Sequence, residues 1–193
     1  METIYIENEH FEKKDFTKES LPKGEYENCD FTHCDFSNYN LSEIKFIDCS
    51  FSYCNLSLVK LGKTVFRDVL FKDCKMLGLH FEDCSEYGLS VSFQNCVLNH
   101  SSFYQAKLKG TGFSDSQLQE TDFTSCDLTE AVFLRCDFTK AKFENTILEK
   151  ADFRTSGNYS INPEMNRIRK ARFSFPGIAG LLGKYDIDID LHP

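Results

Sequence analysis

The 193-residue sequence lacks the features that define several large protein classes. It has no apolar stretch of the roughly 18–20 residues that cross a membrane, and its first residues lack the basic start and apolar core of a signal peptide. It has no glycine-rich phosphate loop, no His-Glu-x-x-His motif and no nucleophile elbow. We therefore expect a cytoplasmic protein with no membrane association, no cofactor, no small-molecule substrate and no enzymatic activity.

Positive charge is also scarce, since 22 Lys and Arg stand against 30 Asp and Glu, for a net charge of −8. This excess of acid disfavours direct binding to nucleic acid or to an anionic membrane. No linker or low-complexity tract divides the chain, so its length predicts a single folded unit.

Nine cysteines are present, but none forms a Cys-x-x-Cys pair and no histidine lies at zinc-finger spacing. Other small residues take the same repeat position elsewhere in the chain, so we expect the cysteines to be buried free thiols that act as small hydrophobic groups. Cys34, Cys54, Cys74 and Cys96 recur at about the same interval and form a column. Stacked neighbours would lie within disulfide reach, although a reducing cytosol favours the thiols.

The dominant feature is a large apolar residue at every fifth position from Phe11 to Phe153, with one interruption. Every phenylalanine except Phe173 and Phe175 falls on this frame. Past the N-terminal units, a smaller residue lies two positions before each large one, so both share one side of an extended segment. Because a period of five fits neither a helix nor a simple strand, the pattern predicts one short unit stacked many times.

Four units of five produce a second period of twenty residues, which aligns the large residues in columns. One column reads Phe11, Phe31, Phe51, Phe71, Phe93, Phe113, Phe133, Phe153 and Phe173. The simplest object with such columns is a four-sided coil whose turns stack at strand spacing, about 4.8 Å. About eight coils would form a rod roughly 40 Å long.

The repeat resembles that of the pentapeptide-repeat proteins, in which a small residue, Asp or Asn, and Leu or Phe precede two polar residues. The segments Cys29–Thr32, Cys126–Thr129 and Ala151–Arg154 match it closely, and the resemblance covers about residues 6–173. It implies an all-β fold, a right-handed quadrilateral β-helix.

The C-terminus departs from the repeat, and we expect residues 1–173 to form the β-helix and residues 174–193 a capping or dimerisation segment. Pro176 is a suitable first residue for a short helix, which three glycines would weaken. The alternation from Asp186 to Leu191 predicts a strand. In Qnr-type quinolone-resistance proteins and their mycobacterial relatives, a helical segment after the coil joins two subunits. That resemblance implies a homodimer, whereas a monomeric cap is the alternative. The candidate interface residues are Phe175, Ile178, Leu181, Leu182 and Tyr185.

The interruption is a two-residue insertion within Glu82–Ser92, where Glu86 is a poor core residue. We expect Leu89 to fill the core position while Glu86 and Tyr87 bulge outward. Functional loops often lie at such breaks.

Two further surface features are candidate partner sites. Asp48 and Asp68 share an outward column, and Leu58 and Leu77 are apolar residues at outward positions close to each other in the repeat.

A rod with regularly spaced negative charges can imitate DNA. The resemblance to Qnr-type proteins implies a DNA mimic that binds DNA gyrase or topoisomerase IV and modulates fluoroquinolone sensitivity. The alternative is a protein-interaction scaffold with another partner and no topoisomerase role. The sequence itself identifies neither the partner nor the direction of any effect on gyrase.

Overall fold

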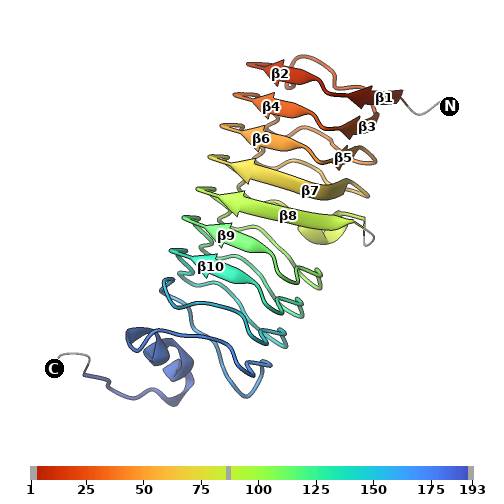
Figure 1. Cartoon of the computed structure of the whole chain (residues 1–193). Helices are drawn as coiled ribbons and strands as arrows, with labels where there is room; N and C mark the ends of the chain where they lie inside the picture. The colour runs from red at the N-terminus through yellow and green to blue at the C-terminus, as the bar shows by residue number, and fades with distance from the viewer. Residues whose placement is uncertain (1–3, 86–87, 191–193) are drawn as a thin grey trace.

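The computed structural model describes residues 4–85 and 88–190, and these form a rod built from one chain wound as a right-handed four-sided β-helix (Figure 1). The described strands belong to one parallel ten-stranded sheet. They are β1 Ile4–Glu7, β2 His10–Glu12, β3 Gly24–Glu27, β4 Asp30–Thr32, β5 Lys45–Ile47, β6 Ser50–Ser52, β7 Val65–Lys72, β8 Leu89–Gln94, β9 Gly112–Ser114 and β10 Val132–Leu134.

The twenty-residue period corresponds to the register of the sheet, because paired residues on adjacent strands are twenty positions apart. Phe11 pairs with Phe31, Phe31 with Phe51, and Phe51 with Phe71 on adjacent parallel strands. Strands occupy two faces of the coil, and the other two faces are joined by isolated bridges such as Asp15–Asp35 and Asp122–Lys142. The predicted four-sided β-helix is therefore confirmed.

The coil count differs slightly from the expected eight, because the regular solenoid has about six turns. Strands follow one another on the same face from β2 to β10. Beyond β10 the pairing on that face is reduced to the isolated bridges Val132–Asp152 and Asp152–Arg172. The end of the rod thus keeps the repeat but loses extended strand pairing.

Stacked aromatic rings fill the core. Phe93, Phe113 and Phe133 stack with ring centroids 4.9 and 5.0 Å apart and interplanar angles of 17° and 21°. Rings of the neighbouring column meet them edge-on, as Phe103 does at 6.0 Å from Phe113. Each coil therefore contacts chiefly the coils above and below it, as expected for a solenoid.

The corners of the coil depend on backbone in the left-handed region. The last residue of almost every unit has φ between 50° and 68°, including Asp48, Leu58 and Lys63. Among the described residues, none of these positions holds Val, Ile, Thr or Pro. β-Branched side chains are strongly disfavoured there, whereas Asn, Asp and Gly are tolerated.

The insertion lies where the sequence indicated. Leu89 of β8 pairs with Phe66 of β7, so it takes the vacant core position as predicted, and the register then shifts between Phe66 and Val69. A single turn of 3₁₀ helix, η1 Phe81–Asp83, precedes the insertion. Glu86 and Tyr87 lie outside the described residues.

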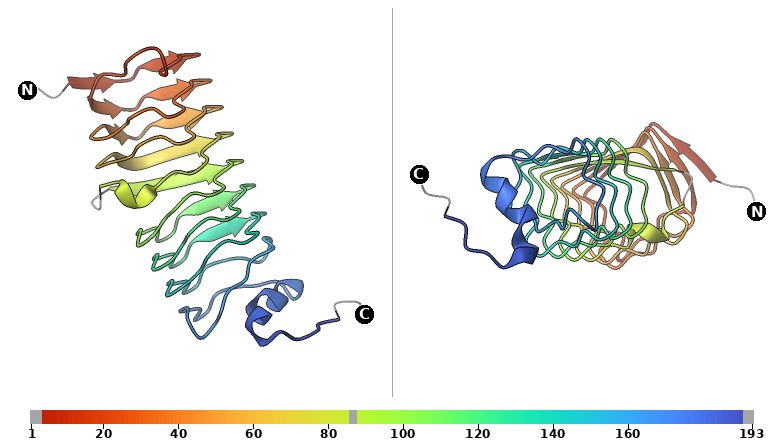
Figure 2. Two further views of the ribbon diagram at one scale, coloured as in Figure 1. Left: turned by 180° about the vertical axis from the view of Figure 1, so that it is seen from behind. Right: turned by 90° about the horizontal axis from the view of Figure 1, so that it is seen from below.

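After Phe173 the chain forms two 3₁₀ helices, η2 Pro176–Leu181 and η3 Gly183–Tyr185, at one side of the last coil (Figure 2). Pro176 opens η2 as expected. The predicted strand is wrong for the described residues of the tail, because Ile187–Asp190 has no neighbouring strand to pair with. None of the described helices is long and apolar enough to span a membrane.

Candidate interaction surfaces

The acidic corner is the group of exposed carboxylates formed by Asp48 and Asp68, which lie where the two strand-bearing faces meet, and by Asp30, which lies on β4 two residues beyond the same corner of an adjacent coil. The Asp48 N–H donates to the Arg67 carbonyl at 2.9 Å, so the turns that hold Asp48 and Asp68 are stacked. One coil from Asp48, Asp30 pairs with Ser50 in the ladder of β4 and β6. The structure therefore brings the two predicted aspartates together and adds Asp30 to them.

Hydrogen bonds to Asp30 and Asp68 come from neutral groups. Ser90 Oγ donates to Asp68 Oδ1 at 2.7 Å, and Ser50 Oγ donates to Asp30 Oδ1. Within residues 4–85 and 88–190, none of the three carboxylates forms an ion pair. Residues 1–50, which include Asp30 and Asp48, hold 12 Asp and Glu against 5 Lys and Arg.

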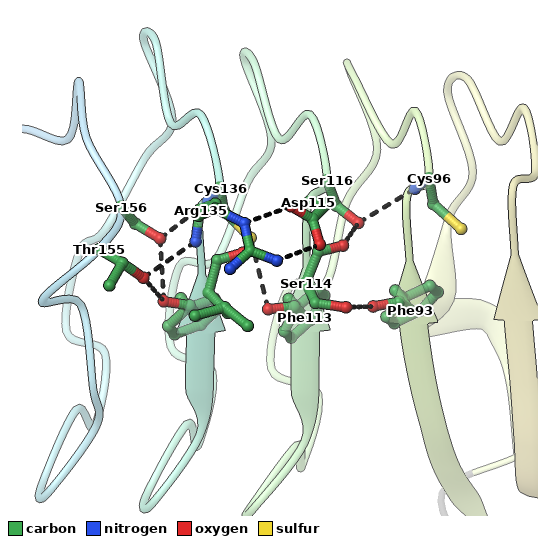
Figure 3. Close-up of polar contacts among 12 residues, drawn as sticks. Phe93, Cys96, Phe113, Ser114, Asp115, Ser116, Arg135, Cys136, Thr155 and Ser156 are labelled. Carbon is green, nitrogen blue, oxygen red and sulfur yellow. Dashed lines mark hydrogen bonds and ion pairs between the residues drawn. The ribbon is translucent and has the colours of Figure 1, made fainter.

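Several carboxylates elsewhere on the rod form an ion pair with a cation one coil away. Arg135 Nε and Nη2 donate to the two carboxylate oxygens of Asp115 at 2.6 and 2.7 Å (Figure 3). The Arg135 guanidinium, chiefly through these hydrogen bonds, holds the pKa of Asp115 below its usual range. Lys150 pairs with Glu130 in the same way. These pairs neutralise charge at their own positions, whereas Asp30, Asp48 and Asp68 form no such pair with a described residue.

Leu58 and Leu77 also meet. The Leu58 N–H donates to the Leu77 carbonyl at 2.9 Å, so the two lie on adjacent coils. Leu58 is 57% exposed at a left-handed corner, and Leu77 is half-buried. A side chain added at Gly78 would meet Leu58 Cδ2 at 3.0 Å, which shows that Leu58 covers that glycine. The result is a small apolar patch on another face.

The insertion opens a cavity of about 550 Å³ between two coils. Phe81, Cys84 and Leu89 line its apolar side, whereas Tyr104 and Lys107 come from the next coil. Glu82 Oε1 lies 2.9 Å from His80 Nδ1, but the buried Oε2 has no hydrogen-bond partner among the described residues. No pattern in the sequence indicates this cavity, because Glu82, Tyr104 and Lys107 are ordinary outward residues of the repeat.

The predicted dimer residues divide into two groups. Phe175 is 84% exposed, and Ile178 and Tyr185 also lie in solvent. Leu181 packs against the core, and Leu182 is half-buried. The C-terminal segment thus covers part of the coil and presents apolar side chains outward.

All nine cysteines are buried free thiols, as predicted. Most of their sulfurs donate to carbonyl groups of neighbouring coils, as Cys54 does to Phe31 at 3.3 Å. Serine can replace them, since Ser156 Oγ accepts from the Cys136 N–H and donates to the Phe133 carbonyl (Figure 3). Burial raises the pKa of Cys49 to about 11. Across the described parts of the chain, no cluster of three or more His, Cys, Asp or Glu is arranged to hold a metal ion.

Comparisons with known proteins agree with this geometry. The family model described as "Pentapeptide repeat region" matches residues 25–86 and 89–158. The search of curated proteins found no match. Among solved structures, HetL, a pentapeptide repeat protein involved in heterocyst differentiation regulation from the cyanobacterium Nostoc, is 14% identical, with 89% of this chain and 86% of HetL covered and a TM-score of 0.53. QnrB1, a plasmid-mediated fluoroquinolone resistance protein, is 16% identical, with 95% of this chain and 100% of QnrB1 covered and a TM-score of 0.46.

Proposed function

Because this chain belongs to the pentapeptide-repeat family, we propose that it is a non-catalytic rod that binds DNA gyrase or topoisomerase IV as a mimic of DNA. The observation that supports this proposal is the acidic corner, where neighbouring coils present unpaired carboxylates along the rod. Binding would occupy the DNA site of the topoisomerase and change its sensitivity to fluoroquinolones. The proposal places the protein in the cytoplasm with its partner.

The spacing of the acidic corner suits this role. Stacked coils lie about 4.8 Å apart, while each strand of B-DNA carries one phosphate per 3.4 Å of axis, roughly. A protein groove that tracks a phosphate backbone would therefore meet a similar line of negative charge. Carboxylates already paired with Arg or Lys, such as Asp115, would contribute little.

We propose further that the protein is a homodimer joined through the C-terminal segment. Phe175, Ile178 and Tyr185 are exposed apolar residues on this end of the rod, and water would be released when a second copy covers them. A two-fold arrangement would put the two acidic ends at opposite tips of a longer rod.

The topoisomerase proposal is tested by titrating the protein into a gyrase supercoiling assay with and without ciprofloxacin. We expect inhibition of supercoiling or protection from the drug, and a smaller effect with Asp48→Lys. Glu144→Lys is the matched control, because it makes the same charge change at an exposed glutamate with no ion pair among the described residues. Absence of any effect of the wild-type protein, or an equal loss in both variants, would contradict the proposal.

The dimer is tested by light scattering. We expect a mass twice the 22.3 kDa of the chain, and a return to the monomer mass in Phe175→Asp. Tyr53→Asp is the control, since Tyr53 is an exposed aromatic residue on the coil itself. A wild-type mass of one chain would instead support the monomeric cap.

The alternative is a scaffold for another protein, and the apolar patch of Leu58 and Leu77 favours it. Affinity capture with the wild-type rod would then return a dominant partner other than a topoisomerase. Leu58→Asp should abolish that capture, whereas Asp48→Lys should leave it unchanged. The opposite pattern would rule out this patch as the docking site.

A further inference from the structure

The rod ends at its N-terminus in two edge strands, β1 and β2, here called the N-terminal edge and comprising residues 4–12. In the described sheet β1 pairs only with β3, and β2 pairs only with β4. Figure 1 shows both strands at the end of the rod opposite the C-terminal segment. Among the described residues no strand lies beyond them, so each has one side without a neighbour.

The N-terminal edge presents unused backbone groups. In the second coil, the Asp30 N–H donates to the Glu9 carbonyl of the first coil at 3.0 Å. His10 lies one coil before Asp30, so by the same repeat its N–H points away from the rod. The Thr32 carbonyl accepts a bond from the first coil, so the Glu12 carbonyl has the same outward direction. Unpaired donors and acceptors on an exposed strand form a template for another strand.

The inward side of the N-terminal edge is incompletely covered. Ile6 and Phe11 occupy core positions, yet both are only partly buried. Their counterparts one coil along, Tyr26 and Phe31, are 0% exposed. Phe11 stacks on Phe31 with ring centroids 4.7 Å apart, and within the described chain no second ring stacks on its other face. An added strand with apolar inward side chains would extend these columns and remove this surface from water.

The rim of the N-terminal edge is acidic. Residues 4–12 contain Glu7, Glu9 and Glu12 but neither lysine nor arginine. Glu12 pairs with the neighbouring Lys13 at 3.1 Å. Glu7 and Glu9 are exposed and form no ion pair with any residue that the structure describes. Two unpaired carboxylates therefore lie beside the unused backbone groups.

This charge decides which strand the edge accepts. A second copy of the same edge would set Glu7 against like charge, which disfavours self-association through these strands. A basic strand would instead place a cation beside Glu7. The rod contains this arrangement between its own coils, where Lys45 Nζ donates to Glu25 at 3.0 Å. The segment that fits alternates outward basic residues with apolar residues that face the core.

We propose that the N-terminal edge docks an extended basic segment of a partner protein, which adds to β1 and β2 as a further strand. Main-chain hydrogen bonds to the His10 N–H and the Glu12 carbonyl would hold the segment. Glu7 and Glu9 would select its lysine or arginine side chains. The site lies at the end of the rod away from the C-terminal segment, so it stays accessible in the proposed homodimer (Figure 1).

Peptide binding tests the proposal. The probe is a fluorescein-labelled peptide of alternating valine and lysine, matched in length to the N-terminal edge, and fluorescence anisotropy measures its affinity for the full chain. We expect saturable binding, and about tenfold weaker binding to Glu7→Lys because an attraction becomes a repulsion. Glu144→Lys is the matched control, since it makes the same charge change at an exposed glutamate on a distant coil, and it should leave the affinity unchanged. No saturable binding to the wild-type chain, or equal affinities of the two variants, would overturn the proposal.

A second measurement separates strand addition from attraction between charges alone. The same peptide with N-methylated backbone amides keeps its lysines but loses its main-chain donors, so its affinity for the wild-type chain should fall about tenfold. In the protein, His10→Pro removes the outward N–H and should weaken binding of the unmodified peptide about fivefold. Circular dichroism checks that this variant is folded. Equal affinities of the two peptides would show that charge alone holds the probe and that no strand is added.

The remaining outcomes also decide the matter. If Asp48→Lys weakens binding more than Glu7→Lys does, the peptide lies on the acidic corner and the N-terminal edge is not its site. If folded His10→Pro binds the peptide as tightly as the wild type, the backbone of β2 takes no part and strand addition is wrong. These measurements contain no topoisomerase, so failure of the topoisomerase proposal would leave this one standing.

Discussion

Truncation of Phe113 to alanine should be among the most destabilising single changes in this protein. Phe113 is 1% exposed and stacks on Phe93 and Phe133, while Phe103 and Phe123 meet its edges. Core Phe→Ala changes cost about 3–5 kcal/mol. Since Phe113 forms two stacked pairs, each worth about 0.5–1.5 kcal/mol beyond burial, we expect a loss of free energy of unfolding near the top of that range, about 4–5 kcal/mol.

The measurement is equilibrium unfolding in urea followed by far-ultraviolet circular dichroism. With a slope of about 2–3 kcal/mol per molar urea, the expected loss lowers the midpoint by about 1.3–2.5 M. Phe113→Leu is the matched control, because leucine occupies the equivalent position in neighbouring units, and it should cost less than about 1.5 kcal/mol. Tyr104→Ala, at an exposed aromatic residue, should change stability by no more than about 0.5 kcal/mol.

The reasoning would be refuted if Phe113→Ala were no more harmful than Phe113→Leu. That result would mean that the coil collapses around the missing ring, and that the aromatic column is not what couples adjacent coils. A transition that splits into two steps would instead agree with a solenoid in which stability is passed between neighbours.

Three further predictions follow from the corners, the thiols and the ion pairs. Lys63 has φ 59°, so Lys63→Gly should raise the free energy of unfolding, measured in urea, by up to about 1 kcal/mol. Lys63→Val should lower the free energy of unfolding, and equal effects of the two variants would contradict the left-handed geometry of the corner. Burial raises the pKa of Cys49 and Cys136 to about 11, so native protein at pH 8 should not react with a thiol reagent until urea unfolds it. The contribution of this raised pKa to the free energy of unfolding is fully present below the unfolded thiol pKa of about 8.5 and is lost as the pH rises toward 11. Urea unfolding at a series of pH values should therefore show the urea midpoint falling over this range. Arg135→Met should raise the pKa of Asp115 toward its ordinary value, as measured by NMR titration. In the wild type, the stabilisation from this pair is present above about pH 3.9 and is lost as the pH falls through the lowered pKa. An unchanged pKa in the variant would show that the pair does not form in solution.

The fold was predictable because the large core residues recur in the sequence at a fixed interval of five. Phe11, Phe31 and Phe51 needed only their spacing to be placed in one column, and Leu89 could be assigned to the broken column because its neighbours were too polar. The inward direction of the small residue two positions earlier could be predicted equally well, since side chains alternate between the two sides of an extended segment.

Other features depended on backbone geometry that side-chain patterns do not record. The left-handed corners hold residues as different as Asp48, Leu58 and Lys63, so no single residue type announces them. The cavity beside Glu82 arises from the way the insertion separates two coils.

The tail and the acidic corner both depend on neighbouring segments, which spacing along the sequence does not specify. The alternation after Asp186 predicted a strand, and that prediction is wrong for residues 187–190 because no described strand lies beside them to pair. Asp48 and Asp68 were aligned by counting, whereas Asp30 joins them only because the corner brings two faces together. Their role in binding stays a prediction, as does that of Leu58 and Leu77.

The direction of the backbone hydrogen bonds has a mechanical consequence. They run between coils and therefore along the axis of the rod, so a pull on its two ends loads every junction between coils in series. Such a rod yields at its weakest junction rather than stretching evenly. The coils that flank the insertion line an open cavity of about 550 Å³, larger than the cavity of about 320 Å³ beside the C-terminal segment, and under tension the molecule should part at the insertion first.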